Sequence, residues 1–111
     1  MSEEIKKLRK EIDEQDAIIV RALGKRFEAT REVGEIKAEN DLPARDPKRE
    51  EEQRERIAEL AVDAGIPNEL IQEILGLILT EVIFEHVGIR ERHDEAQIAA
   101  QHSVHFRLES S

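Results

Sequence analysis

Apolar residues recur along the first third of the chain at helical spacing. The positions concerned are Ile5, Leu8, Ile12, Ile19, Leu23, Phe27, Val33 and Ile36. Steps of mostly three, four or seven residues place such side chains on one face of a helix. No proline interrupts the stretch before Pro43, which closes the first cluster of helix-breaking residues, 40–43. The pattern predicts one helix of roughly 35 residues, about 50 Å long.

A second helix is bounded by explicit start and stop signals. Asp46 can cap its first turn, and Pro47 suits the first helical position. The pair Ala64-Gly65 supplies a stop signal. These residues predict a helix over 47–63, and the charged run 49–56 is expected to be mostly a solvated face with ion pairs one turn apart.

A third helix is predicted to start near Pro67-Asn68. From Ile74 to Phe84 it is apolar on nearly every side, so we expect it to form the core of a helical bundle. Phe27 and Phe84 are accordingly expected in the core.

The apolar pattern decays after His86. Residues 96–100 would tolerate a helix, whereas 101–111 show no periodicity and are expected to fray. We therefore predict a helical domain over 1–90 and a C-terminal extension over 91–111, partly helical and then frayed.

The first helix is too long for a compact domain of this size. A globule of this length has a radius of gyration of roughly 13 Å and a diameter of about 35 Å. Either the helix breaks near Gly24, or it projects and needs a partner to cover its apolar stripe. We favour an all-α, three-helix chain that forms an intertwined, helix-swapped homodimer.

Composition narrows the class further. The 111 residues are 39% apolar and 39% charged, with 3% aromatic residues, 5 Gly and 3 Pro, which argues against β-sandwiches and barrels. There is no cysteine, so disulfides, thiol nucleophiles and cysteine-containing zinc sites are excluded. A net charge of -9 argues against nucleic-acid binding.

Neither a membrane span nor a metal site is expected. The most apolar stretch, 70–84, is too short to cross a bilayer, and the charged N-terminus offers no secretory signal, which favours the cytoplasm. His93, His102 and His105 match no strong metal-ligand spacing.

Two cations on the first helix suggest a binding site. Arg26 and Lys37 are eleven residues apart, within roughly 20° of one helix face, and the small residues Thr30 and Gly34 lie near the same line. A shallow depression between two cations would suit a compact dianion, although ordinary surface cations give the same pattern. Arg9 points about 100° away from Arg26. In an antiparallel dimer it could complete the partner's site.

The segments 8–13 (LRKEID), 33–37 (VGEIK) and 42–50 (LPARDPKRE), together with Arg26, resemble the all-helical class of chorismate mutase. The resemblance covers roughly residues 5 to 90. It implies an intertwined homodimer that rearranges chorismate to prephenate, without a cofactor, on the route to phenylalanine and tyrosine.

The resemblance also implies roles for individual residues. Arg26 and Arg49 would hold substrate carboxylates, and Arg9 would reach in from the other chain. Lys37 would donate to the ether oxygen, and Glu50 and Asp46 would meet the ring hydroxyl. A Claisen rearrangement is pericyclic and needs no nucleophile, so catalysis comes from holding the substrate and stabilising charge on the ether oxygen.

The chain departs from this family pattern on the third helix. His86 stands where the family commonly has Gln and sometimes Glu, and Val82 stands where some members have a small polar residue. Our hypothesis is that His86 donates to the ether oxygen, so that activity rises as the pH falls. The alternative is a partly exposed histidine near a helix end.

Three other functions fit the same residues. Relatives on this scaffold act as isochorismate pyruvate-lyases, which tend to lose the acidic residue corresponding to Glu50, and as aminodeoxychorismate mutases. Retention of Glu50 favours the mutase. A dimeric helical interaction module without catalysis is the remaining alternative, because a fold does not establish an activity.

Overall fold

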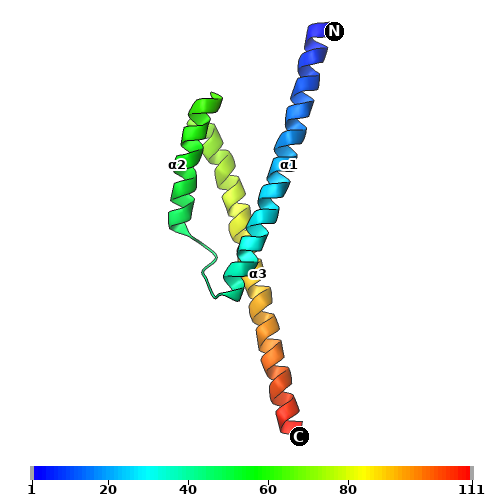
Figure 1. Cartoon of the computed structure of the whole chain (residues 1–111), viewed down its shortest axis with the longest axis vertical. Helices are drawn as coiled ribbons and strands as arrows, with labels where there is room; N and C mark the ends of the chain where they lie inside the picture. Colours follow the sequence, from blue (N-terminus) through cyan, green and yellow to red (C-terminus); the bar gives the residue numbers. More distant parts are fainter. Residues whose placement is uncertain (1, 111) are drawn as a thin grey trace.

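The chain folds into three helices that form an elongated molecule. In a computed structural model, which describes residues 2–110 and the side chains of 2–102, these are α1 (Glu3–Glu39), α2 (Pro47–Ala64) and α3 (Asn68–Ser110). The chain measures 81 × 32 × 15 Å. Figure 1 shows α1 and α3 crossing near the middle, with α2 beside the first half of α3. The all-helical fold class is thus confirmed for the described residues. The side chain of His105, one of the histidines considered above for a metal site, lies outside the described side chains.

Helix α1 is continuous over its whole length. Ser2 caps its start, because the Ser2 hydroxyl oxygen accepts a hydrogen bond from the Ile5 amide at 3.2 Å. The helix passes through Gly24 without a break, so the alternative of a break there is wrong. An unbroken glycine costs only about 1 kcal/mol relative to alanine, which a long helix tolerates.

The end of α1 is a Schellman motif, in which two amides beyond the helix bond back to its last carbonyls. The Leu42 amide donates to the Lys37 carbonyl at 2.8 Å, and the Asp41 amide donates to the Ala38 carbonyl at 3.3 Å. Asp41 has φ +55°, the left-handed conformation that this motif requires. The chain therefore turns sharply into the α1–α2 loop (residues 40–46).

Helix α2 begins and ends at the capping and stop signals predicted from the sequence. The Asp46 carboxylate accepts a hydrogen bond from the Arg49 amide at 3.2 Å, and Pro47 occupies the first turn. Gly65 ends the helix with φ +71°. The observed end at Ala64 lies one residue beyond the prediction.

Helix α3 begins at Asn68, as predicted, but continues to Ser110. The expectation that residues 101–111 fray stays a prediction. Segment 91–102 is rich in Ala, Glu and Gln, which favour helix without needing an apolar face, and Arg90 pairs with Asp94 one turn later. The division between a domain and an extension at residue 90 stays a prediction.

Helix α3 contacts both other helices, whereas α1 and α2 do not pack on each other over the described residues. Among the side chains that the structure describes, the buried apolar ones are Ala38, Ala61 and Leu75. The expectation that Phe84 lies in the core is not met within a single chain, where Leu77 and Phe84 are each 75% exposed. Phe27 is half-buried. Two neighbours cover only part of the circumference of α3.

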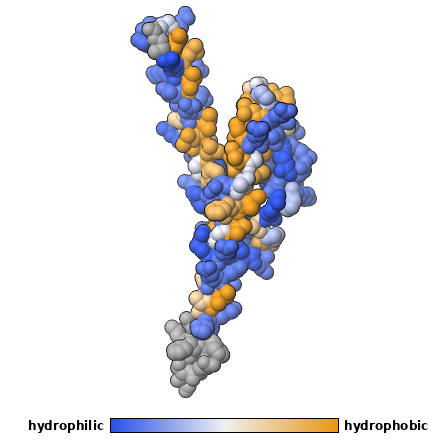
Figure 2. Space-filling view, turned by 180° about the vertical axis from the view of Figure 1, so that it is seen from behind, coloured by the Kyte–Doolittle hydropathy of each residue, from blue (hydrophilic) through white to orange (hydrophobic). Residues whose placement is uncertain are grey.

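A long apolar stripe is consequently left open. It includes Ile5, Leu8, Ile12 and Ile19 on α1, all exposed. Figure 2 shows apolar side chains along α1 and along the facing arm formed by α2 and α3. Over the residues described, none of the helices combines the length and apolarity needed to cross a membrane.

Candidate active site

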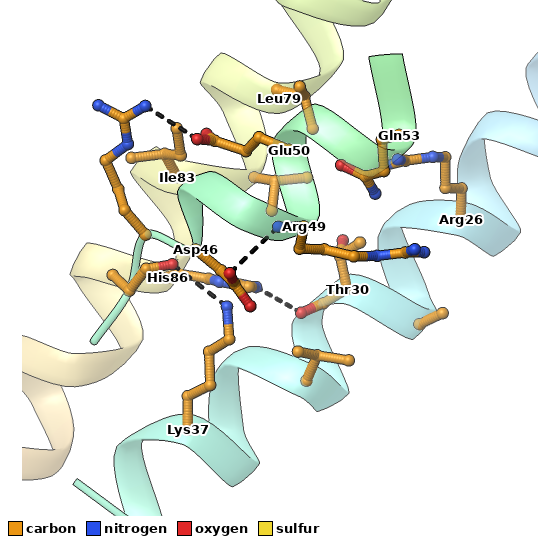
Figure 3. Close-up of a pocket in the computed structure, with 15 residues that line it drawn as sticks. Arg26, Thr30, Lys37, Asp46, Arg49, Glu50, Gln53, Leu79, Ile83 and His86 are labelled. Carbon is orange, nitrogen blue, oxygen red and sulfur yellow. Dashed lines mark hydrogen bonds and ion pairs between the residues drawn. The ribbon is translucent and has the colours of Figure 1, made fainter. Parts of the chain in front are cut away.

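A cavity of about 330 Å³ lies where the three helices and the α1–α2 loop meet (Figure 3). This is within the size range of small-molecule sites. Seven of the eight predicted site residues line it, namely Arg26, Lys37, Asp46, Arg49, Glu50, Val82 and His86.

Helical spacing brings these residues together. On α1 the lining residues 26, 30, 33 and 37 are separated by steps of three or four, which place them on one face. The same steps relate 46, 49, 50 and 53 at the start of α2, and 79, 82, 83 and 86 on α3. Three helix faces therefore converge on one cavity, and they carry cations, carboxylates and an imidazole.

Two arginines give the cavity a cationic side. The Arg26 Nη1 atom is buried and has no hydrogen-bond partner among the described residues. Burial, and then the positive charge of Arg49, lower the pKa of Arg26 from its ordinary value. Figure 3 shows both guanidinium groups at the same side of the cavity. A carboxylate placed there would satisfy the buried donor and offset the repulsion between the two cations.

Lys37 projects into the cavity from the last turns of α1. Its ammonium group donates a hydrogen bond to the Ala44 carbonyl at 3.3 Å, and the residue is half-buried. An ammonium group has three donors, so this contact orients the side chain and leaves donors for a ligand.

In each of the two predicted carboxylates, one oxygen already accepts a hydrogen bond within the protein. Glu50 is only 8% exposed, and the Arg45 Nη2 atom donates to its Oε2 atom at 2.9 Å. Asp46 uses its Oδ1 atom to cap α2. Each carboxylate keeps a second oxygen, which can accept a hydrogen bond from a ligand hydroxyl.

His86 is buried in the middle of α3, so the alternative of a partly exposed histidine near a helix end is wrong. It is 4% exposed, and its Nε2 atom lies 2.6 Å from the Thr30 carbonyl oxygen. A carbonyl only accepts, so Nε2 carries the proton of this hydrogen bond. The Nδ1 atom is buried without a partner among the described residues. It becomes a donor only when the ring is protonated.

Gly34 has a different place from the one expected. Thr30 lines the cavity as predicted, but Gly34 does not, because the ring of His86 lies against it. A Cβ atom at Gly34 would be 2.6 Å from the His86 Cδ2 atom and 3.0 Å from the Ile89 Cδ1 atom. The glycine therefore gives the imidazole its space at the crossing of α1 and α3.

One polar lining residue, Gln53, was not predicted from the sequence. It was assigned to a solvated face, yet it is half-buried and lines the cavity. Its position one turn after Arg49 was the available signal, since residues four apart share a helix face.

Arg9 is the predicted site residue that does not line the cavity of its own chain. It lies seventeen residues before Arg26 on the unbroken helix α1, about 25 Å away along the axis. Its contribution from a second chain stays a prediction.

Comparison with known proteins gives consistent matches. The profile of the family described as chorismate mutase type II matches residues 8–87. The chain is 47% identical over 92 residues to a bifunctional chorismate mutase/prephenate dehydratase from Aquifex aeolicus, covering 81% of this chain and 25% of that protein. It is 35% identical to a T-protein from Enterobacter agglomerans, covering 73% of this chain and 22% of that protein. A chorismate mutase from Methanocaldococcus jannaschii is 30% identical, with 78% of this chain and 82% of that protein covered. The chain thus spans about a quarter of the first two relatives and most of the third.

Proposed function

The chain belongs to the chorismate mutase type II family, and from this premise we propose that it rearranges chorismate to prephenate, on the route to phenylalanine and tyrosine. The observation that carries the proposal is the convergence of Arg26, Arg49 and Lys37 on one cavity, with a buried guanidinium donor left unpaired. The proposal keeps the cytoplasmic location expected from the sequence.

In this proposal Arg26 and Arg49 bind the carboxylates of chorismate. Guanidinium groups form bidentate contacts with carboxylates, which fix orientation as well as position. Holding the flexible enolpyruvyl ether in its reactive, chair-like geometry removes most of the entropic barrier of a pericyclic reaction. No nucleophile, cofactor or covalent intermediate is required.

Lys37 and His86 supply donors to the ether oxygen, on which negative charge develops as the C–O bond breaks. Lys37 is oriented for this role by the Ala44 carbonyl. His86 uses Nε2 for the Thr30 carbonyl, so only the imidazolium form offers an Nδ1–H donor to the substrate. The second donor is therefore switched on by protonation.

Glu50 and Asp46 accept the hydrogen bond of the ring hydroxyl in the same arrangement. The ion pair between Arg45 and Glu50, at 2.9 Å, fixes the Glu50 carboxylate beside the cavity. Val82 adds an apolar wall that excludes water.

We also propose that two chains form an intertwined dimer in which Arg9 of each chain completes the other's site. The exposed stripe of Ile5, Leu8, Ile12 and Ile19 supports this, because monomers rarely leave so long an apolar surface in water. An antiparallel second α1 would cover the stripe and carry its own Arg9 toward the cavity. Sedimentation at micromolar concentration should give a dimer, and a monomer would contradict both statements.

Incubation with chorismate and, separately, with isochorismate tests the proposed function. Chromatography against prephenate, salicylate and pyruvate standards identifies the products. We expect prephenate from chorismate, with kcat/KM reduced at least about 100-fold in Arg26→Ala and in Lys37→Ala.

Arg21→Ala is the matched control, since Arg21 is an exposed cation of α1 about 140° away from Arg26. It should retain wild-type turnover. Salicylate and pyruvate as the main products would show that the chain is an isochorismate pyruvate-lyase instead. No turnover of either substrate would favour the noncatalytic interaction module.

A further inference from the structure

Arg90 links α3 to the loop that carries part of the cavity wall. It lies on α3 just beyond the residues that match the family, 8–87. Its Nη1 atom donates to the Leu42 carbonyl at 3.0 Å, and its Nη2 atom pairs with the Asp41 carboxylate. Both partners belong to the α1–α2 loop, some 48 residues away in the sequence.

Asp94 holds the Arg90 side chain in the conformation that makes these contacts. The Arg90 Nε atom donates to both oxygens of Asp94, at 3.2 and 3.3 Å. Partial burial by itself lowers the pKa of Arg90, but the hydrogen bond and charge of Asp94, followed by those of Asp41, raise it above the ordinary value. One planar guanidinium thus joins a side chain of its own helix to a backbone and a side-chain acceptor of the loop.

The loop is held from a second direction by the site itself. The Lys37 ammonium donates to the Ala44 carbonyl, two residues after Leu42. Ala44, Arg45 and Asp46 line the cavity. The contacts of Arg90 and Lys37 therefore bracket the segment that delivers these residues, and a shift of the loop would move the acceptor that orients Lys37.

We propose that Arg90 is a positioning residue that clamps the α1–α2 loop and so keeps Lys37 and Asp46 in their working places. The clamp is a property of the fold, whereas its effect on turnover rests on the proposed function. The pair with Asp41 contributes only part of the clamp, because Asp41 is 85% exposed and its charge is partly screened. The hydrogen bond from Arg90 to the Leu42 carbonyl, and the bonds to Asp94 that orient Arg90, complete the clamp on the loop.

The test combines amide hydrogen exchange of residues 41–46 with chorismate kinetics in Arg90→Ala. We expect loop exchange to become at least about tenfold faster. We expect kcat to fall about tenfold because the Lys37 donor is displaced, while KM changes less than about threefold because Arg26 and Arg49 still bind the carboxylates. Arg90→Lys should recover part of both losses, since an ammonium group reaches one acceptor but cannot span all three.

Two further variants separate the clamp from general stability. Arg92→Ala is the matched control, because Arg92 lies on the same helix and forms no ion pair among the described side chains, and it should leave exchange and kcat unchanged. Asp41→Gly relieves the positive φ and therefore preserves the end of α1, yet it removes one acceptor, so kcat should still fall about threefold.

Unchanged loop exchange in Arg90→Ala, or unchanged kcat in an Arg90→Ala chain whose loop exchanges faster, overturns the proposal. If Arg90→Ala does not fold, wild-type kcat and exchange in Asp41→Gly overturn it instead. Absence of chorismate turnover in the wild-type chain contradicts the proposed function, and the exchange measurement then still decides whether the clamp exists.

Discussion

The absence of a side chain at Gly34 determines where the imidazole ring of His86 lies. Gly34 is buried at the crossing of α1 and α3, and its lack of a Cβ atom lets His86 approach the α1 backbone and bond to the Thr30 carbonyl. The contact spans 56 positions in the sequence. The pocket therefore depends on a glycine that touches no ligand.

Replacement of Gly34 by Ala should destabilise the protein despite the higher helix propensity of alanine. The propensity gain is about 1 kcal/mol, whereas forcing a methyl group against the His86 ring costs about 1–3 kcal/mol and displaces the ring. Urea unfolding at fixed protein concentration measures the balance. Gly24→Ala, whose new methyl group would meet nothing within 4 Å, should be stabilising by about 1 kcal/mol. Equal effects of the two substitutions would contradict this interpretation of the crossing.

The protonation of His86 should be visible in the pH profile. We expect kcat to rise as the pH is lowered, because only the imidazolium form of His86 offers an Nδ1–H donor. His86→Gln should flatten the profile, since an amide donates at every pH. The variant keeps the other charged groups that line the cavity, so the difference between profiles reports His86. These groups are Arg26, Lys37, Arg45, Asp46, Arg49 and Glu50. A profile of the same slope in both proteins would exclude the switch.

Site residues could be predicted where helical spacing alone places them. Arg26 and Lys37 share a face of one helix, and periodicity finds such pairs. The contact between His86 and Thr30, and the cavity position of Gln53, depend on how helices cross and how the loop folds back. Tertiary packing decides these features, and a one-dimensional pattern does not contain it.

At the scale of the helices, ends with local chemical signals were predictable and ends without them were not. Asp46, Pro47 and Gly65 fix α2 to within one residue. Helix α3 has no stop signal after His86, so its end at Ser110 could not be placed from the sequence. Apolar periodicity reports packing partners, whereas a helix persists through any run of residues with good propensity.

Gly65 provides a test at this scale. With φ +71° it holds the left-handed position that ends α2, and a Cβ there would meet nothing within 4 Å, so only backbone strain is tested. Gly65→Ala should lower the free energy of unfolding by about 1 kcal/mol, and Gly65→Asn by roughly half as much, since Asn tolerates this conformation better. Urea unfolding of both variants measures this difference, and an unchanged Gly65→Ala would contradict the assigned helix end.

At the scale of the whole molecule, the elongated shape of a single chain supports the proposal that a second chain packs against it. Its radius of gyration is 21.4 Å, against roughly 13 Å for a compact domain of this length. The overshoot of α1 was predictable from the uninterrupted apolar stripe. The exposure of Leu77 and Phe84 was not, because a pattern that predicts burial does not say which chain supplies the cover.

Restoration of activity between two defective chains tests the central claim, a catalytic site shared by two protomers. Arg9→Ala and Arg26→Ala should each be inactive. When equal amounts are unfolded in urea and refolded together, half of the dimers contain one chain of each kind. Each such dimer has one intact site, with Arg26 from one chain and Arg9 from the other.

Prephenate formation from chorismate is the measurement. We expect recovery of about one quarter of the wild-type rate, since half of the dimers each regain one of two sites. Each variant refolded alone is the control and should remain inactive. A mixture that stays as inactive as its two components would contradict the shared site.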